Sequence, residues 1–274
     1  MQRLDRLGWA AGMVFTSFGV RVGVRTTDPA ILKEVEPVLP PGWKPAPGRS
    51  VSHLFSIVAG GTGSNKGVRK MWILYDGWVR LARSRQPEPI FEALESAVRL
   101  QVAENAPRRI FVHAGSVAWR GKAILIPGRS FSGKSTLVSE LVRAGATYYS
   151  DEYAVLDSRG RVHPFPSPLS MREPGGFVGT DRHPSEFGGT TGDKPLPVGM
   201  VLVTSYKEGA RWRPRELSAA EGALEMLANT VPARSRPDAA LATLKAAVKD
   251  AEILKGKRGE ASEAAEALIA HLGW

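Results

Sequence analysis

The sequence predicts an α/β fold, in which strands and helices alternate along most of the chain. Three observations carry this prediction. A short apolar strand at 123–127 leads through a glycine-rich turn into a helix at 137–144. A nearly continuous apolar run at 198–206 is typical of a strand buried in the centre of a sheet. Apolar residues at helical spacing over 89–104 predict a further amphipathic helix.

The composition narrows the class of protein. The chain has 274 residues, a net charge of +10 and no cysteine, so disulfides and thiolate metal sites are excluded. Basic proteins attract phosphates, nucleic acids and anionic membranes, and charge alone does not separate these partners. The sequence contains no run of about 18 apolar residues, so we expect no membrane span. Early arginines followed by an apolar stretch outline a signal peptide, but Asp5 interrupts the basic region. We therefore interpret this stretch as the first strand and expect a cytoplasmic protein.

Residues 1–107 form an N-terminal α+β region whose role the sequence does not reveal. Alternating valines at 20–24 predict a strand, and Asp28 followed by Pro29 predicts the start of a short helix. Further strands are expected at 51–58 and 70–84, with a hairpin turn at Asp76–Gly77, before the helix at 89–104. We place a domain boundary near 107.

Residues 108–274 form the second region, which contains the predicted strand–loop–helix. Strands are expected at 109–113, 116–120, 123–127 and 147–149, and a hairpin over 152–165 turns near Arg159–Gly160. Residues 166–197 are rich in proline and glycine, and a loop of this length is usually functional or mobile. After the strand at 198–206 we expect only helices. Their start signals are a capping box at Ser218 and Glu221, Pro237, and a cap at Ser262.

The glycine-rich turn matches the spacing G-x-x-x-x-G-K-[S/T] of a P-loop. Two glycines allow backbone bends that point successive N–H groups at phosphates, and the helix that follows adds its positive end. A P-loop must lie between a strand and a helix, and this segment does. Lys134 would reach the β- and γ-phosphates and the Ser135 hydroxyl would bind Mg²⁺. The candidate nucleotide-binding residues are Gly128, Arg129, Ser130, Phe131, Ser132, Gly133, Lys134, Ser135 and Thr136.

Three further polar residues are predicted to gather at this loop. A two-residue turn at Gly121–Lys122 would bring His113 level with Ser130. A right-handed crossover would then deliver the strand at 147–149 parallel to 123–127, with Asp151 and Glu152 at its carboxyl end. Phosphoryl transfer needs a base for the attacking hydroxyl and a carboxylate near the metal, and two adjacent acids beside an imidazole could divide these roles.

These motifs resemble a known family. The pattern H-A-G-x-V from His113, the glycine-rich loop, and the acidic pair in ATYYSDEYAVL are similar to the catalytic domain of HPr kinase/phosphorylase. They are closer still to HPr-kinase-related proteins without the regulatory apparatus, some of which are serine kinases of ribosomally made peptides such as lasso-peptide precursors. Phosphoenolpyruvate carboxykinases are more distant relatives by fold. The resemblance implies a P-loop kinase core that uses ATP and Mg²⁺. It implies Asp151 as the proton acceptor, His113 as its partner and Lys134 as a third catalytic residue. It also implies Ser135, Glu152 and Asp151 as the residues at the metal.

The resemblance is specific over about 109–165 and has two departures. The family's usual acidic pair is Asp-Asp, whereas this chain has Asp151–Glu152. The acidic and basic segment that bifunctional enzymes use for phosphorolysis has no counterpart in 166–197. We therefore expect neither phosphorylase activity nor HPr as substrate. The expected partner is a peptide or protein with a serine or threonine hydroxyl, and related kinases form homo-oligomers.

Several alternatives stay open at this point. Arg172 or Lys194, in the long loop, could act as a charge clamp on the γ-phosphate or could be solvated loop charges. The mixed basic and aromatic segment 205–216 could bind single-stranded nucleic acid, although a basic turn is the more ordinary account, and nucleic acid is not the expected partner. The same core could phosphorylate a small molecule, serve as a nucleotide-binding regulatory module, or act as a nucleic-acid-dependent ATPase.

Overall fold

The structure is a computed structural model that describes residues 4–5, 7–60, 71–128, 132–172 and 179–273. The chain divides into two compact units, Met1–Pro107 and Arg108–Trp274. Both units mix helices with sheets, so the chain belongs to the α/β class of folds. None of the helices in the described part of the chain combines the length and apolar character that a membrane span requires.

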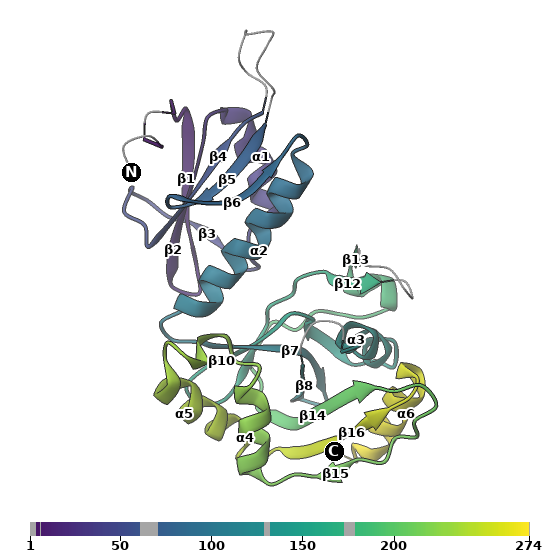
Figure 1. Ribbon diagram of the computed structural model, residues 1–274. Coiled ribbons are helices and arrows are strands. Elements are labelled where there is room, and N and C mark those ends of the chain that lie inside the picture. The colour runs from purple at the N-terminus through teal and green to yellow at the C-terminus, as the bar shows by residue number, and fades with distance from the viewer. Residues whose placement is uncertain (1–3, 6, 61–70, 129–131, 173–178, 274) are drawn as a thin grey trace. The chain divides into compact units, whose positions relative to one another are not determined.

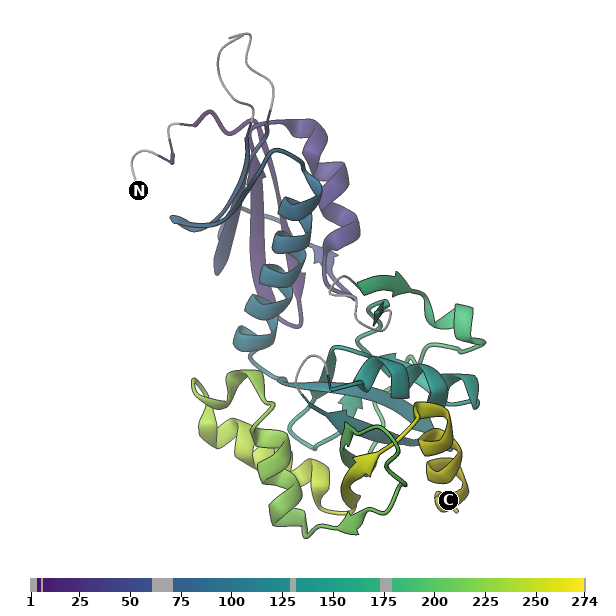
Figure 2. The ribbon, with the colours of Figure 1, turned by 45° about the vertical axis from the view of Figure 1, so that its right-hand side comes forward.

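The first unit is a mixed sheet with its helices on one face (Figure 2). In the described residues the strand order is β3-β1-β2-β4-β5-β6, and only β2 and β4 pair in parallel. The strands are β1 (Ala11–Ser17), β2 (Val20–Thr26), β3 (Lys44–Pro45), β4 (His53–Val58), β5 (Trp72–Asp76) and β6 (Val79–Ser84). The helices are η1 (Pro29–Ile31), α1 (Leu32–Val35), η2 (Glu36–Val38) and α2 (Glu88–Asn105).

Local signals account for most of this unit. The Asp28 carboxylate accepts the N–H of Ala30 at 2.9 Å and caps the first helix, as the sequence predicts. The buried face of α2 comprises Ile90, Leu94, Val98 and Val102. The β5–β6 turn is Gly77–Trp78, because Asp76 pairs with Val79. The turn predicted at Asp76–Gly77 is therefore wrong by one residue.

The second unit has a sheet covered by helices on both faces (Figure 1). Its strand order is β11-β10-β7-β8-β14-β16-β15, with β9 also paired to β7, and its parallel core is β8-β14-β16. The strands of this sheet are β7 (Ile110–Trp119), β8 (Lys122–Pro127), β9 (Thr147–Ser150), β10 (Tyr153–Leu156), β11 (Val162–His163), β14 (Val198–Tyr206), β15 (Arg215–Glu216) and β16 (Glu252–Arg258). The helices are α3 (Lys134–Arg143), η3 (Pro184–Phe187), α4 (Ala219–Leu227), η4 (Val231–Ala233), α5 (Pro237–Val248) and α6 (Ala261–His271).

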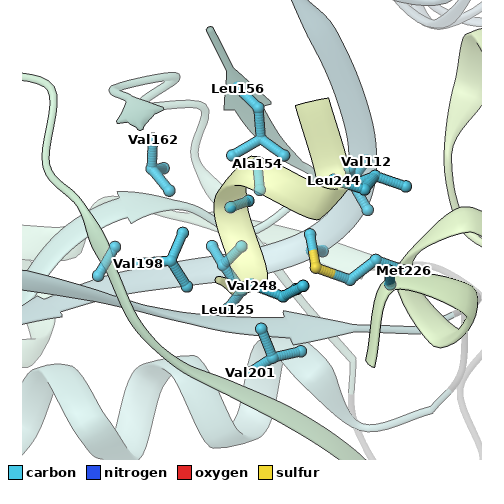
Figure 3. Packing of buried hydrophobic residues seen from close by; sticks show 14 of the residues in the cluster. Val112, Leu125, Ala154, Leu156, Val162, Val198, Val201, Met226, Leu244 and Val248 are labelled. Carbon is cyan, nitrogen blue, oxygen red and sulfur yellow. The ribbon is translucent and has the colours of Figure 1, made fainter. Parts of the chain in front are cut away.

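Two hydrophobic clusters define the two faces. Helices α3 and α6 pack on one face, against side chains that include Val117, Ile124 and Met200. We call this the α3 face. Helices α4 and α5 pack on the other, where Met226 and Leu244 lie against Leu125 and Val201, among others (Figure 3). Alternation along the strands divides the side chains between the two clusters.

Two predictions for the C-terminal half are wrong. The region after β14 is not wholly helical, because β16 pairs in parallel with β14 along its whole length and β15 pairs with β16. Helix α6 begins at Ala261 with Glu260 as its N-cap, so Ser262 does not cap it. The long loop 166–197 also contains a hairpin of β12 (Leu169–Arg172) and β13 (Gly179–Arg182), followed by η3.

The β10–β11 turn is held by a buried carboxylate. Asp157 is 6% exposed and accepts hydrogen bonds from the backbone N–H groups of Arg159 and Arg161 and from the Arg161 guanidinium. Nε2 of His163 lies 3.0 Å from the same carboxylate. Burial alone would raise the pKa of Asp157, but the bonds from His163, Arg161 and Arg159 outweigh it and lower the pKa from 3.8 to about 2.

This shift predicts an acid-sensitive contribution to stability. The pKa of Asp157 is lowered by folding, so its contribution is complete above about pH 4 and is lost as the pH falls towards 2. Asp157→Asn should reduce the free energy of unfolding at pH 7 by about 2 kcal/mol. Urea unfolding at several pH values measures this loss, with Asp250→Asn at an exposed position as the control. An equal effect of the two substitutions would contradict the prediction.

Candidate functional site

The glycine-rich loop joins β8 to α3, as the sequence predicts. Arg129, Ser130 and Phe131 lie outside the described residues. Gly133 precedes α3 with a left-handed φ of +80°, and a Cβ there would lie 2.5 Å from a guanidinium nitrogen of Arg258. A Cβ on Gly128 would lie 2.8 Å from Ser132 Oγ. The backbone conformation therefore favours glycine at position 133, whereas at both positions a side chain would have to move to admit a Cβ.

The β7–β8 hairpin places His113 beside the first residue of this loop. Its turn is Arg120–Gly121, and both residues have positive φ (45° and 84°), which a type I′ turn requires. His113 O accepts the N–H of Gly128 at 3.2 Å. The turn predicted at Gly121–Lys122 is thus wrong by one residue. The correction moves the register by two, so that His113 is level with Gly128 rather than Ser130.

The acidic pair lies on the other side of the same strand. β9 and β10 both pair with β7 in antiparallel orientation, Ser150 opposite Ser116 and Tyr153 opposite His113. Between these pairs the chain bends at Asp151 and Glu152. The Ser150 hydroxyl accepts the N–H groups of Glu152 and Tyr153, at 3.2 and 3.0 Å, which holds the bend.

The predicted direction of the strand at 147–149 is confirmed. β9 runs parallel to β8, with β7 between the two strands, and Asp151 and Glu152 follow its carboxyl end. β9 and β10 pair with successive parts of β7, and the acids occupy the bend between them. The carboxyl end of β8, His113 and the acids are therefore at one level of the sheet.

The register also indicates which face each acid occupies. By register, Asp151 lies opposite Gly115 on β7. A Cβ on Gly115 would lie 2.6 Å from Val138 and 4.0 Å from the Lys134 Cβ, so this position is under the first turns of α3. Glu152 lies opposite Ala114, and the Glu152 carbonyl accepts the Ala114 N–H at 3.3 Å. Ala114 belongs to the opposite cluster. By register, Asp151 is therefore the acid on the α3 face, and it is 7% exposed.

The side chain of His113 is exposed and lies next to an aromatic ring. Its ring lies 4.7 Å, centroid to centroid, from that of Tyr153. Neighbouring atoms partly desolvate the imidazole and the positive charge of Lys134 adds to this, so the pKa of His113 is lowered from its usual value of 6.5. The ring is therefore neutral at pH 7 and has a nitrogen able to accept a hydrogen bond.

Lys134 gives this shift a direct test. Lys134→Met removes a positive charge near the imidazole, so the pKa of His113 should rise towards its usual value. An NMR titration of the imidazole C–H signals measures this change. Lys122→Met, at the opposite end of β8, is the matched control and should leave the His113 titration as it is. A fall in the pKa, or no change, in the Lys134 variant would show that the two groups are not neighbours.

A buried tyrosine, Tyr148, lies close enough to the acidic bend for the charge of Asp151 to act on it. Tyr148 is fully buried, and its hydroxyl donates to Ser167 O at 2.6 Å. Burial and the charge of Asp151 raise the pKa of Tyr148 far above its usual value. The phenol is therefore protonated at neutral pH and donates its hydrogen bond to Ser167 O.

The donor atoms fit a nucleotide with its Mg²⁺. Ser132 Oγ is buried and has no hydrogen-bond partner among the described residues, as expected of a loop shaped for a polar ligand. Within the same described residues no group of three His, Cys, Asp or Glu side chains forms a metal site. Mg²⁺ in phosphoryl-transfer sites needs only one or two carboxylates beside the phosphates and water. Ser135, Asp151 and Glu152 supply oxygen donors of that kind.

Sequence reasoning missed Arg258, which the fold brings to the loop. This guanidinium is 2% exposed, and its Nη2 donates to Gly133 O at 2.7 Å. Burial lowers the pKa of Arg258. The residue was missed because β16 was taken for helix. Gly256 and Gly259 were the available signal, because two glycines within four residues disfavour a helix.

The remaining candidates lie in the segments around the sheet. Arg172 is the last residue of β12. The carbonyl of Lys194 accepts the Tyr149 hydroxyl at 2.7 Å, which fixes the backbone of the long loop against β9. Of the two aromatic residues in the basic segment 205–216, Tyr206 is 49% exposed, whereas Trp212 is half-buried and packs against the α3-face cluster. It is therefore not freely available as a stacking surface for a nucleic-acid base.

The sequence matches no protein-family model and no curated protein. Any functional assignment therefore depends on the residues and geometry of this site.

Proposed function

We propose that the protein is an ATP-dependent kinase with a core of the HPr kinase and phosphoenolpyruvate carboxykinase type. One observation carries the proposal. A glycine-rich loop with P-loop spacing, a neutral histidine and a buried aspartate lie at one level of adjacent strands, His113 beside Gly128 and Asp151 beside Gly115. A nucleotide-binding module without chemistry would need the loop but not the other two groups.

Each group has a role that follows from its position. Asp151 accepts the proton of the attacking hydroxyl, because it is the acid on the α3 face. His113 is a positioning residue: its neutral ring accepts a hydrogen bond and holds the hydroxyl or Asp151 in line. Lys134 at the start of α3 places a positive charge near His113, where it stabilises charge developing on the transferred group.

Mg²⁺, when bound, neutralises charge on the phosphate oxygens. Ser135 in the first turn of α3 and Asp151 on the same face would hold it. The motif resemblance adds Glu152, whose register position is on the opposite face, as a further ligand. The Gly133 backbone and the N-terminus of α3 direct N–H groups to the phosphates.

The acceptor we propose is a serine or threonine hydroxyl in a peptide or protein. The support for it is the motif resemblance over 109–165, together with the net charge of +10, which favours acidic partners. A small-molecule hydroxyl acceptor would use the same groups.

Transfer of label from γ-labelled ATP tests the proposal. The full chain with Mg²⁺ is incubated with a library of serine- and threonine-containing peptides, and phosphorylated products are identified by mass spectrometry. We expect labelled phosphoserine or phosphothreonine. ATP binding without transfer to any peptide or small hydroxyl compound would favour the nucleotide-binding module. Hydrolysis that rises with added RNA or DNA would favour a nucleic-acid-dependent ATPase.

A further inference from the structure

The glycine-rich loop has two flanks, and only one of them carries the proposed chemistry. On the β7 flank lie His113 and Asp151. On the other flank, β14 pairs with β8, and β16 pairs with β14, all in parallel. The carboxyl ends of these strands, at Tyr206 and Arg258, are therefore at the same edge as the loop.

Tyr206 stands beside the loop on this second flank. Its Cβ lies 3.9 Å from the position that a Cβ on Gly133 would occupy. Side chains alternate between the two faces along β14, so Tyr206 lies on the same face as Met200 and Leu202. This is the α3 face, on which the loop leads into α3. The side chain is 49% exposed, although Leu202 on the same strand is fully buried.

Two neighbours hold the exposed ring in place. The hydroxyl donates to Glu260 Oε1 at 3.1 Å. The guanidinium carbon of Arg258 lies 5.8 Å from the ring centroid, within the range of a cation–π contact. Because Arg258 Nη2 also bonds to Gly133 O, one buried side chain contacts both the ring and the loop. The ring thus has a fixed position relative to the loop.

We infer that Tyr206 is the stacking platform for the base of the bound nucleotide. This inference rests on the proposed function and adds the subsite that it leaves open. The β14 flank lies on the other side of the loop from His113 and Asp151, so it can receive the nucleoside part of a nucleotide whose terminal phosphate lies at those residues. On the β14 flank the described structure offers a fixed, half-exposed aromatic ring, and every nucleobase has a π face that can stack on such a ring.

The experiment compares ATP with inorganic triphosphate, which has the same charged groups but no base. Calorimetry measures the affinity of both ligands, with Mg²⁺, for the wild-type chain and for Tyr206→Ala. We expect ATP affinity to fall about tenfold or more in the variant, and triphosphate affinity to stay unchanged. Tyr206→Trp and Tyr206→Phe keep a ring and should retain ATP affinity. Leu224→Ala, which removes an exposed apolar side chain from α4, is the matched control.

Any different result would contradict either the base-stacking role of Tyr206 or the proposed function. Unchanged ATP affinity in Tyr206→Ala would place the base elsewhere and leave the kinase proposal standing. Equal losses for ATP and triphosphate, in a variant whose circular dichroism matches that of the wild-type chain, would show that Tyr206 shapes the loop and does not hold a base. A wild-type chain that binds neither ligand would overturn the proposed function itself.

Discussion

Asp151→Asn should lower the rate of phosphoryl transfer by about a hundredfold to ten-thousandfold while ATP is still bound. Asparagine matches aspartate in shape, so the bend held by Ser150 and the packing under α3 should persist. What is lost is the carboxylate that accepts the hydroxyl proton. Single-turnover kinetics with γ-labelled ATP measure the transfer step, and calorimetry measures binding separately.

Glu152→Gln is the matched control for this prediction. This substitution also removes one carboxylate charge from the bend, but at the next residue, which lies opposite Ala114. As a metal ligand, Glu152 should affect the Mg²⁺ concentration needed for half-maximal rate, whereas Asp151→Asn should affect the rate at saturating Mg²⁺. If the two variants exchanged these effects, the roles assigned to the acids would have to be exchanged. Full activity in both would rule out a carboxylate base at this bend.

Gly160→Ala should destabilise the second unit by about 3 kcal/mol or more. Gly160, in the turn before β11, has a left-handed φ of +76°, which costs a residue with a Cβ about 1 kcal/mol. The added Cβ would also lie 2.3 Å from the backbone nitrogen of Ala247 in α5, and backbone atoms cannot move aside as a flexible side chain can. Urea unfolding followed by circular dichroism measures the loss.

Gly188→Ala separates the two contributions. Gly188 has nearly the same φ, +75°, but a Cβ there would meet nothing within 4 Å. This control should therefore cost only about 1 kcal/mol, the conformational part. If both substitutions cost the same, the turn does not pack on α5 as the structure has it.

Local patterns predicted most individual elements of this chain. The Asp28 cap, the amphipathic helix α2, the strand–loop–helix around Gly133 and the buried strand β14 are all present. Each is encoded by residues close together in the sequence, through capping, periodicity or continuous hydrophobicity. Turn positions were less accurate. Gly121 was recognised, but the residue that shares the turn with it is Arg120, an uncommon residue at positive φ.

β16 shows where local patterns fail. Its residues Glu252–Arg258 alternate weakly and follow a helix, so they were taken for more helix. They form a strand because β14 offers an unpaired parallel edge, and that edge exists only in the folded sheet. The pairing of β9 and β10 also arises only in the folded sheet, where both strands have β7 as their partner.

The sequence by itself determined the parts of the candidate site. The sequence alone identifies the spacing of Gly128 and Gly133, the histidine that precedes them and the acidic pair that follows. The tertiary structure decided how they meet. The hairpin register brought His113 to Gly128, and the bend between β9 and β10 brought Asp151 to the α3 face. Two parallel strands distant in the chain, β14 and β16, placed Tyr206 and Arg258 on the second flank. Pairing between distant segments depends on which edges are free and which faces are buried, and no short stretch of sequence carries that information.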